Sequence, residues 1–211
     1  LGAGFGSLLA PLLLVLSPYF IFMHATLLSH TSGVLATTLL LWAYLRWRET
    51  GSWRDAAIAG AAWGLICLNR TFTALCLCIP LALDALWVLW GQRSLARLIG
   101  VAVFGASAAA GVGALLVYNA LAVGDPLTMT YLFYDPSEKL GFGLRHTAGI
   151  AIDHTFRNGL IYLRDNVVSL DRWLLGMPWG LVIMAALIAI GWCRRTSLLL
   201  VACTLSVWVG Y

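Results

Sequence analysis

A short polar stretch between two apolar runs carries a residue suited to binding an anion. Arg70 lies between Asn69 and Thr71, with long apolar sequence on either side. The planar guanidinium of arginine donates paired hydrogen bonds to phosphate oxygens, and a lipid-linked phosphate would lie at this depth. Arg70 could instead reach ordinary lipid headgroups without binding a specific ligand. We expect it to bind phosphate.

A second polar stretch precedes another apolar run. Ser29 or Thr31 is suited to capping the helix that follows, and the start of a helix attracts anions. His30 could add a contact to phosphate or to a metal ion, or it could be an interfacial histidine without a function. The candidate phosphate-binding residues are Arg70, His30 and Ser29.

Residues 118–143 are rich in turn-forming residues and tyrosine. Gly124-Asp125-Pro126 is a turn signal, and Gly141-Phe142-Gly143 is a flexible aromatic tip. Tyrosine and aspartate side chains on an ordered loop suit sugar hydroxyls, although the same composition builds any loop at a membrane interface. The candidate substrate contacts in this loop are Asn119, Asp125, Tyr131, Tyr134 and Phe142.

Asp84 is an acid within an apolar run. Ionisable groups at membrane depth cost free energy and often have a function. Asp84 could relay protons, or it could be a structural acid that pairs with a neighbouring helix or with Arg93, and we favour the structural role. No motif of a soluble enzyme is present, and the five cysteines form no C-x-x-C pair.

The composition indicates how these residues must be positioned. The 211 residues are 61% hydrophobic and 10% charged, with a mean hydropathy of +0.89, whereas soluble domains carry roughly 25% charged residues. This excludes a cytosolic enzyme, a nucleic-acid-binding module and a disordered tail. We expect an all-α polytopic membrane protein with about seven transmembrane helices. Their expected ranges are Phe5–Phe22, Ser32–Leu45, Ala56–Leu68, Phe72–Trp90, Leu98–Leu121, Pro178–Trp192 and Ser197–Tyr211.

Basic residues predict the orientation of these helices. Loops after the second, fourth and sixth expected spans contain seven arginines, and the short loops on the other side contain one, Arg70. Because positive residues gather on the cytoplasmic side, we expect the arginine-rich loops to be cytoplasmic. The seven arginines are Arg46, Arg48, Arg54, Arg93, Arg97, Arg194 and Arg195.

Small residues predict close helix packing. Gly60 and Gly64 form a G-x-x-x-G pattern, and Gly105, Ala109 and Gly113 repeat small residues every four positions. Such stripes let helices approach closely in lipid.

We expect three regions: residues 1–121 with five spans, an extracytoplasmic segment at 122–177, and residues 178–211 with two more spans. Within the middle region apolar residues recur at intervals of three and four opposite charged ones, which predicts an amphipathic helix in the membrane interface or over a cavity. These apolar residues are Phe156, Leu160, Leu163, Val167, Leu170 and Leu174.

Because the chain starts at Leu1 without Met and stops in an apolar run, we expect it to be a piece of a longer protein.

Several of these motifs resemble those of a known enzyme group. Ser17-Pro18-Tyr19-Phe20 followed by Ser29-His30, and Gly60-x-x-x-Gly64 running to Arg70, resemble bacterial family 39-like glycosyltransferases of the GT-C fold. This group includes the protein mannosyltransferases and aminoarabinose transferases. Tyr118-Asn119, Gly124-Asp125-Pro126-Leu127, Tyr131 and the Gly-Phe-Gly tip resemble a loop in some uncharacterised members.

The resemblance implies an enzyme of the bacterial inner membrane that moves a sugar from a polyprenyl-phosphate donor to a lipid, glycan or protein acceptor. It implies that Arg70 is the basic donor-binding position and that an acid before Leu1 activates the acceptor hydroxyl. No cofactor is evident. Metal use stays open, because Ser29-His30 stands where other members often carry an acid.

Two other classes fit the same sequence. A transporter or flippase for a lipid-linked substrate would use Asp84 and kinked spans without bond chemistry, and a structural subunit of an envelope complex would need neither. Every alternative keeps membrane lipid as a partner, and none involves nucleic acid.

Overall fold

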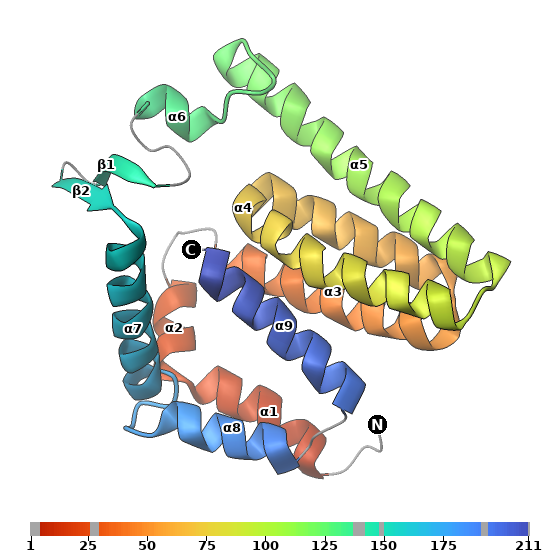
Figure 1. The fold of residues 1–211 in the computed structure, drawn as a ribbon, viewed down its shortest axis with the longest axis horizontal. Coiled ribbons are helices and arrows are strands. Elements are labelled where there is room, and N and C mark those ends of the chain that lie inside the picture. Colours follow the sequence, from red (N-terminus) through yellow and green to blue (C-terminus); the bar gives the residue numbers. More distant parts are fainter. Residues whose placement is uncertain (1–4, 26–29, 137–141, 148–149, 191–193, 211) are drawn as a thin grey trace.

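The computed structural model describes residues 5–25, 30–136, 142–147, 150–190 and 194–210, and it is almost entirely helical. Figure 1 shows the long helices of the central part of the chain packed together with the C-terminal helix, and the remaining elements beside them. In chain order the elements are α1 (Phe5–Leu16), α2 (Pro18–Ala25), α3 (His30–Thr50), α4 (Trp53–Gly91), α5 (Leu95–Val123), α6 (Thr130–Tyr134), β1 (Gly143–Thr147), β2 (Ile150–His154), α7 (Phe156–Trp173), α8 (Gly180–Ile190) and α9 (Arg194–Gly210).

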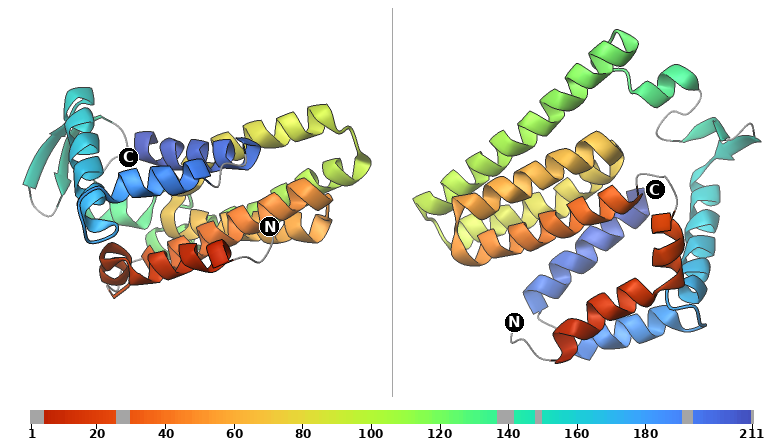
Figure 2. Two further views of the ribbon diagram at one scale, coloured as in Figure 1. Left: turned by 90° about the horizontal axis from the view of Figure 1, so that it is seen from below. Right: turned by 180° about the vertical axis from the view of Figure 1, so that it is seen from behind.

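Helix α4 bends back on itself at Arg70. Arg70 has non-helical backbone angles of φ −147° and ψ 72°, so residues 53–69 and 71–91 form two arms. The indole N–H of Trp63 in the first arm donates a 2.9 Å hydrogen bond to the carbonyl of Ala74 in the second. The arms therefore lie side by side, as the ribbon shows (Figure 2). The bend lies at Asn69–Thr71, the polar stretch that was predicted to separate two apolar runs.

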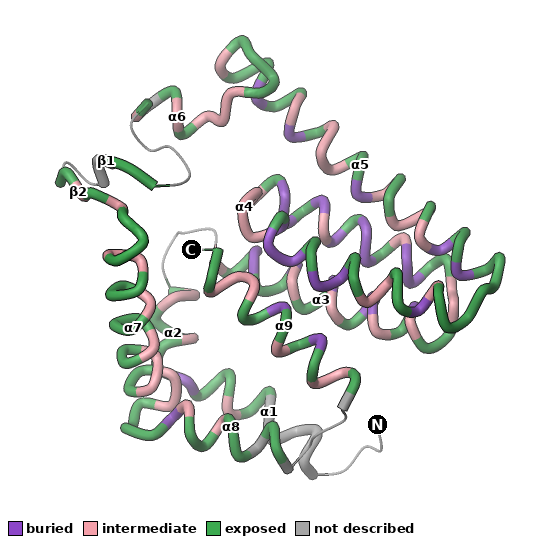
Figure 3. Tube along the Cα trace, in the orientation of Figure 1, coloured by how far each residue is buried: buried purple, intermediate pink, exposed green. Residues whose placement is uncertain are grey.

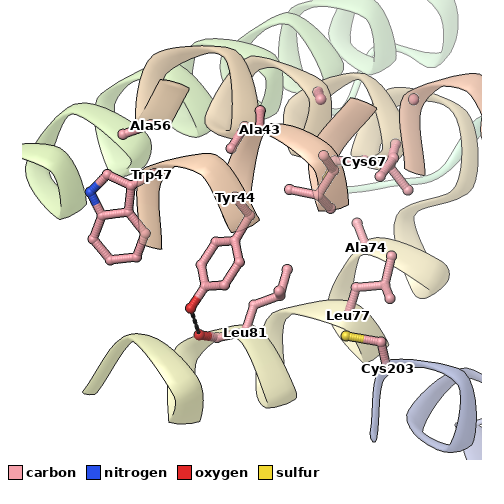
Figure 4. Packing of buried hydrophobic residues seen from close by; sticks show 14 of the residues in the cluster. Ala43, Tyr44, Trp47, Ala56, Cys67, Ala74, Leu77, Leu81 and Cys203 are labelled. Carbon is pink, nitrogen blue, oxygen red and sulfur yellow. Dashed lines mark hydrogen bonds between the residues drawn. The ribbon is translucent and has the colours of Figure 1, made fainter. Parts of the chain in front are cut away.

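The buried core lies between α3, both arms of α4, and α9 (Figure 3). Leu40 and Ala43 of α3 pack with Ala59, Ile66 and other side chains that are almost fully buried. Figure 4 shows Tyr44 inside this core, where its hydroxyl donates a 3.0 Å hydrogen bond to the Leu81 carbonyl. Most large apolar side chains outside this cluster are exposed, as expected of helices solvated by lipid rather than water.

Close contact of α4 with α5 depends on glycine. A methyl group added at Gly64 would lie 3.0 Å from the Gly111 Cα atom, and one added at Gly60 would collide with the backbone of Phe104. The G-x-x-x-G pattern in α4 is therefore a packing surface, as predicted. The prediction that Gly105 and Gly113 belong to the packing face of α5 is wrong, because a methyl at either position would meet nothing within 4 Å.

The described part of the chain has two helices, α4 and α5, that are long and apolar enough to cross a membrane. A third span is possible if α2 and α3 count together across their 118° bend. The expectation of seven spans is not supported. One reason is that the first expected span, Phe5–Phe22, breaks at Ser17 into two short helices, because proline at residue 18 removes a backbone donor. Helix α8, with 11 residues, is likewise too short.

Helices α1, α2, α7 and α8 and the two strands lie beside this bundle, whereas α6 contacts α5. Ser17, between α1 and α2, is buried and donates a hydrogen bond to the Leu174 carbonyl just after α7. Strands β1 and β2 form an antiparallel hairpin with Gly143 opposite His154. The predicted amphipathic segment is helical, as α7 over Phe156–Trp173, and it has no buried residue.

Candidate functional site

Arg70 occupies the break in α4, where the helical hydrogen-bond pattern is interrupted. The hydroxyl of Thr71 donates a 2.8 Å hydrogen bond to the Cys67 carbonyl, which satisfies an acceptor close to the break. Hydroxyl groups that bond back to the preceding turn often accompany helix bends. The bend turns the Arg70 side chain toward the start of α3 instead of along the axis of α4.

Arg70 and His30 meet at this end of the bundle. The Arg70 Nη2 donates to the His30 Nδ1 at 2.9 Å, although the two residues are 40 positions apart in sequence. The acceptor must be a neutral imidazole. Burial, the Arg70 guanidinium and His24, in that order of size, lower the pKa of His30 below 6.5. The pair therefore presents one positive charge near neutral pH.

A second contact holds the same two helices together. The side-chain amide of Asn69 donates a 2.5 Å hydrogen bond to the Ser32 hydroxyl. Gly33 follows at once, and a methyl there would lie 3.6 Å from the Arg70 Cδ. The first turn of α3 and the bend of α4 thus form one polar cluster, which we call the Arg70 cluster: His30, Ser32, Asn69 and Arg70.

An apolar groove of about 430 Å³ opens directly beside the Arg70 cluster. Ser32 and Asn69 line its polar end, and the rest is aliphatic. Volumes of this order are typical of small-molecule sites. The aliphatic lining comes from α3 and the first arm of α4, and consists of Leu35, Ala36, Leu39, Leu65 and Leu68.

The structure brings together two of the three residues predicted to bind phosphate. Arg70 and His30 are in contact, whereas Ser29 lies outside the described residues. The contacts of Asn69 and Ser32 were not foreseen from the sequence. Asn69 directly precedes Arg70, and Ser32 lies two positions after His30. These polar side chains close to the two candidates are the sequence feature that could have predicted the contacts.

The candidate substrate loop follows the end of α5. Asp125 accepts hydrogen bonds from Leu127 N at 3.1 Å and Thr128 Oγ1 at 2.5 Å, and these bonds, that from Thr128 first, lower the pKa of Asp125. Asn119 is 1% exposed, and its amide donates to the Pro126 carbonyl at 3.2 Å. The side chains of Asn119 and Asp125 therefore use these hydrogen bonds to stabilise the turn at residues 125–128.

Two of the aromatic candidates of the same segment, Tyr131 and Phe142, are more accessible. Tyr131 is 40% exposed on the short helix α6, which also contains Tyr134. Phe142 is 72% exposed, and its ring stacks on His154 of the hairpin at 5.8 Å between centroids. The ring of His154 in turn stacks on Tyr162 of α7 at 6.1 Å. Direct contact of these residues with a substrate stays a prediction.

The other end of the bundle carries a charged cluster around Asp84. The Tyr44 hydroxyl shares its one proton between the Leu81 carbonyl and the Asp84 Oδ2, which lies 2.9 Å away, and Arg48 lies 3.5 Å from Oδ1. Arg195 of α9 approaches the same Oδ1 at 3.9 Å. Asp84 therefore pairs with neighbouring helices, which matches the structural role favoured from the sequence, but its partners are Arg48 and Arg195 rather than Arg93.

Comparison with known proteins adds no relative. No family model, no curated protein and no solved structure matches this chain. Among the described residues there is also no group of three or more His, Cys, Asp or Glu side chains placed to hold a metal ion. The Arg70 cluster and the groove beside it are therefore the structural features from which a function is proposed.

Proposed function

We propose that this protein is a membrane glycosyltransferase of the GT-C type and that Arg70 and His30 bind the phosphate of a polyprenyl-phosphate sugar. The observation that supports this is the position of the Arg70 cluster at the polar end of an apolar groove. A phosphate needs a cation and hydrogen-bond donors, whereas an isoprenoid chain needs an apolar surface. The two requirements are met side by side on α3 and α4.

The proposed reaction requires a positive charge beside the phosphate, which is the role we assign to Arg70. The acceptor hydroxyl forms a bond to the anomeric carbon of the sugar and loses its proton to a base. The bond between that carbon and the phosphate oxygen breaks, and the phosphate leaves with the electron pair. A guanidinium beside the phosphate stabilises the charge that develops there. Arg70 supplies that charge, while neutral His30 holds the guanidinium in place through Nδ1.

The proposal includes a location and an acceptor class. The apolar helices α4 and α5 are consistent with a membrane protein. We place the protein in the bacterial inner membrane as a multi-pass enzyme, with the Arg70 cluster facing the outer side. The acceptor is a lipid, a glycan or a protein that is reached from that side.

The test is a titration of the purified protein, in detergent, with a polyprenyl phosphate of defined length. Arg70→Ala should weaken binding by roughly ten- to a hundredfold, because a charge-assisted hydrogen bond contributes on the order of 1.5–3 kcal/mol. Arg70→Lys should recover part of the loss, because an ammonium lacks the paired donors of a guanidinium. Arg54→Ala, at the opposite end of the bundle, is the matched control. Unchanged binding in Arg70→Ala would contradict the proposal.

A transporter or flippase for the same lipid-linked substrate is the second candidate. The observation in its favour is the interruption of helices at Ser17 and Arg70, because broken helices form substrate sites in many transporters. Reconstituted vesicles loaded with labelled donor separate the two functions. A transferase releases polyprenyl phosphate and a glycosylated acceptor, whereas a flippase moves the intact donor across the bilayer.

A further inference from the structure

An apolar cavity of about 150 Å³ lies inside the helical bundle, separate from the groove beside Arg70. Side chains of α3, both arms of α4 and α5 line it, and four of them are labelled in Figure 4: Tyr44, Trp47, Ala56 and Leu81. Natural protein interiors are close-packed and contain few voids larger than a water molecule. An engineered cavity of this volume holds benzene or xenon, so the space is large enough for part of an organic molecule.

Alanines on the two arms of α4 leave this space open. Ala56 and Ala59 lie three residues apart on the first arm and therefore share one face of the helix. Ala82 and Ala85 have the same spacing on the second arm. The indole of Trp63 also lines the cavity, and it reaches from the first arm to the second through its N–H group. A bulky ring thus separates two faces that carry only methyl groups.

The described residues that line the cavity turn no polar atom toward it. The Tyr44 hydroxyl is engaged by the Leu81 carbonyl and by Asp84. The Trp47 Nε1 packs against Gly100, where an added methyl would collide with it. A buried water molecule needs two to four polar partners, so the cavity suits an apolar occupant rather than water.

The cavity is reached from the outer surface of the second arm of α4. Cys78 and Ala82 line it and are exposed, whereas Trp47 and Ala59, which also line it, are 3% and 0% exposed. With the membrane location proposed above, the exposed side of α4 faces the hydrocarbon tails of lipids. These tails are the apolar groups that surround the entrance.

The depth of the cavity indicates which tails fit. Ala85 lies six residues before the end of α4, and Val101 lies six residues after the start of α5. Roughly 9 Å of helix therefore separates each of them from the arginine-rich end, at 1.5 Å per residue. Arg70 is 15 residues before Ala85, roughly 22 Å toward the other end. A phospholipid with its headgroup at the arginine-rich end has its acyl chains at the level of the cavity.

We propose that an acyl chain of a membrane phospholipid enters this cavity from the side, past Cys78 and Ala82. The chain packs against the rings of Trp47, Trp63 and Phe104, and it restores the dispersion contacts that an empty space lacks. The lipid then becomes part of the contact between α5 and α4. This site rests on the membrane location, but it does not depend on the transferase reaction or on the donor groove at Arg70.

The test is photolabelling of the protein in phosphatidylcholine vesicles. The probe is a phosphatidylcholine that carries a diazirine in one acyl chain, and mass spectrometry maps its adducts after irradiation. We expect adducts on Trp47 or Ala59, which are 3% and 0% exposed and line the cavity. Leu40 is equally buried but does not line the cavity, so it should carry no adduct. If Trp47 and Ala59 are labelled no more than Leu40, the proposal is overturned.

Cavity-filling variants test whether the adducts come from within the cavity. Ala59→Leu on the first arm and Ala85→Leu on the second should each lower labelling of Trp47 about tenfold, because the leucine side chain occupies the space that the chain needs. Ala102→Leu is the matched control, because Ala102 is exposed on α5 and does not line the cavity. Equal labelling of Trp47 in all three folded variants would overturn the proposal.

A competition experiment distinguishes a phospholipid from the proposed donor. Excess polyprenyl phosphate should leave the labelling of Trp47 unchanged, because its phosphate is expected at Arg70, at the other end of the bundle. Loss of the Trp47 adduct would show that an isoprenoid chain occupies the cavity and would overturn the assignment to phospholipid. Failure of the donor to bind at Arg70 would leave the photolabelling result unaffected, so the two proposals are tested separately.

Discussion

Gly64 of α4 and Gly111 of α5 face each other with no room for a side chain between them. A methyl at Gly64 would lie 3.0 Å from the Gly111 Cα, closer than packed carbon atoms normally approach. We expect Gly64→Ala to separate the two helices and to destabilise the protein by about 1–3 kcal/mol, the usual cost of overpacking. Denaturation of the purified variant in mixed micelles measures this.

Gly113→Ala is the matched control for that variant. The position is on the same helix pair, but a methyl there meets nothing within 4 Å. Alanine is a better helix former than glycine by roughly 0.5–1 kcal/mol, so this variant should be neutral or slightly more stable. A loss of stability equal to that of Gly64→Ala would contradict the packing explanation.

The Arg70–His30 contact predicts a pH dependence of anion binding. The pKa of His30 is lowered, so the neutral form is favoured in the folded protein. Its contribution to stability is present above pH 6.5 and is lost as the pH falls through the lowered pKa. Protonation adds a second positive charge beside Arg70, and an anion that neutralises both should then bind more tightly.

Decyl sulfate is a suitable probe for this prediction, because its charge does not change between pH 5 and 8. We expect its affinity to rise as the pH falls over that range, and His30→Gln to abolish the rise. His154→Gln, on the distant hairpin, should leave the profile unchanged. A profile in the wild-type protein that is flat with pH would show that His30 does not contribute to anion binding.

Asp171 joins α7 to α8. Its two carboxylate oxygens accept hydrogen bonds from the backbone N–H groups of Trp179 at 3.0 Å and Leu181 at 2.9 Å. Removing a cap of this kind costs about 0.5–2 kcal/mol. Asp171→Ala should therefore increase hydrogen exchange at residues 179–183. Asp165→Ala removes an exposed carboxylate that pairs with its neighbour Arg164 and should not affect these amides.

Sidedness is testable by labelling single cysteines in a background without native cysteine. Ser52 lies in the connection between α3 and α4, at the arginine-rich end, and Ser137 follows α6 in the sequence. Because positive residues favour the cytoplasmic side, an impermeant reagent added from outside should label Ser137→Cys and spare Ser52→Cys. The reverse result would invert the topology and would place Arg70 on the cytoplasmic side.

The sequence by itself determined the helical class of the fold and the position of most helices. Apolar runs without charge must be helical in lipid, because every backbone group needs an internal partner. The spacing of Phe156, Leu160 and Leu163 likewise sufficed to predict α7, since helical periodicity is a local property. The turn at Arg70 followed from the same kind of local pattern.

Tertiary structure decided which residues meet. No local sequence pattern predicts that Arg70 contacts His30. The pairing of Asp84 with Arg48 and Arg195 is equally unpredictable, because both sets of contacts depend on how helices far apart in sequence are arranged. The packing face of α5 was misjudged for the same reason: small residues occur on more than one face, and only the neighbour α4 selects Gly111 over Gly113. Local spacing fixes a helix, whereas contact between helices is set by the shape and charge of both partners.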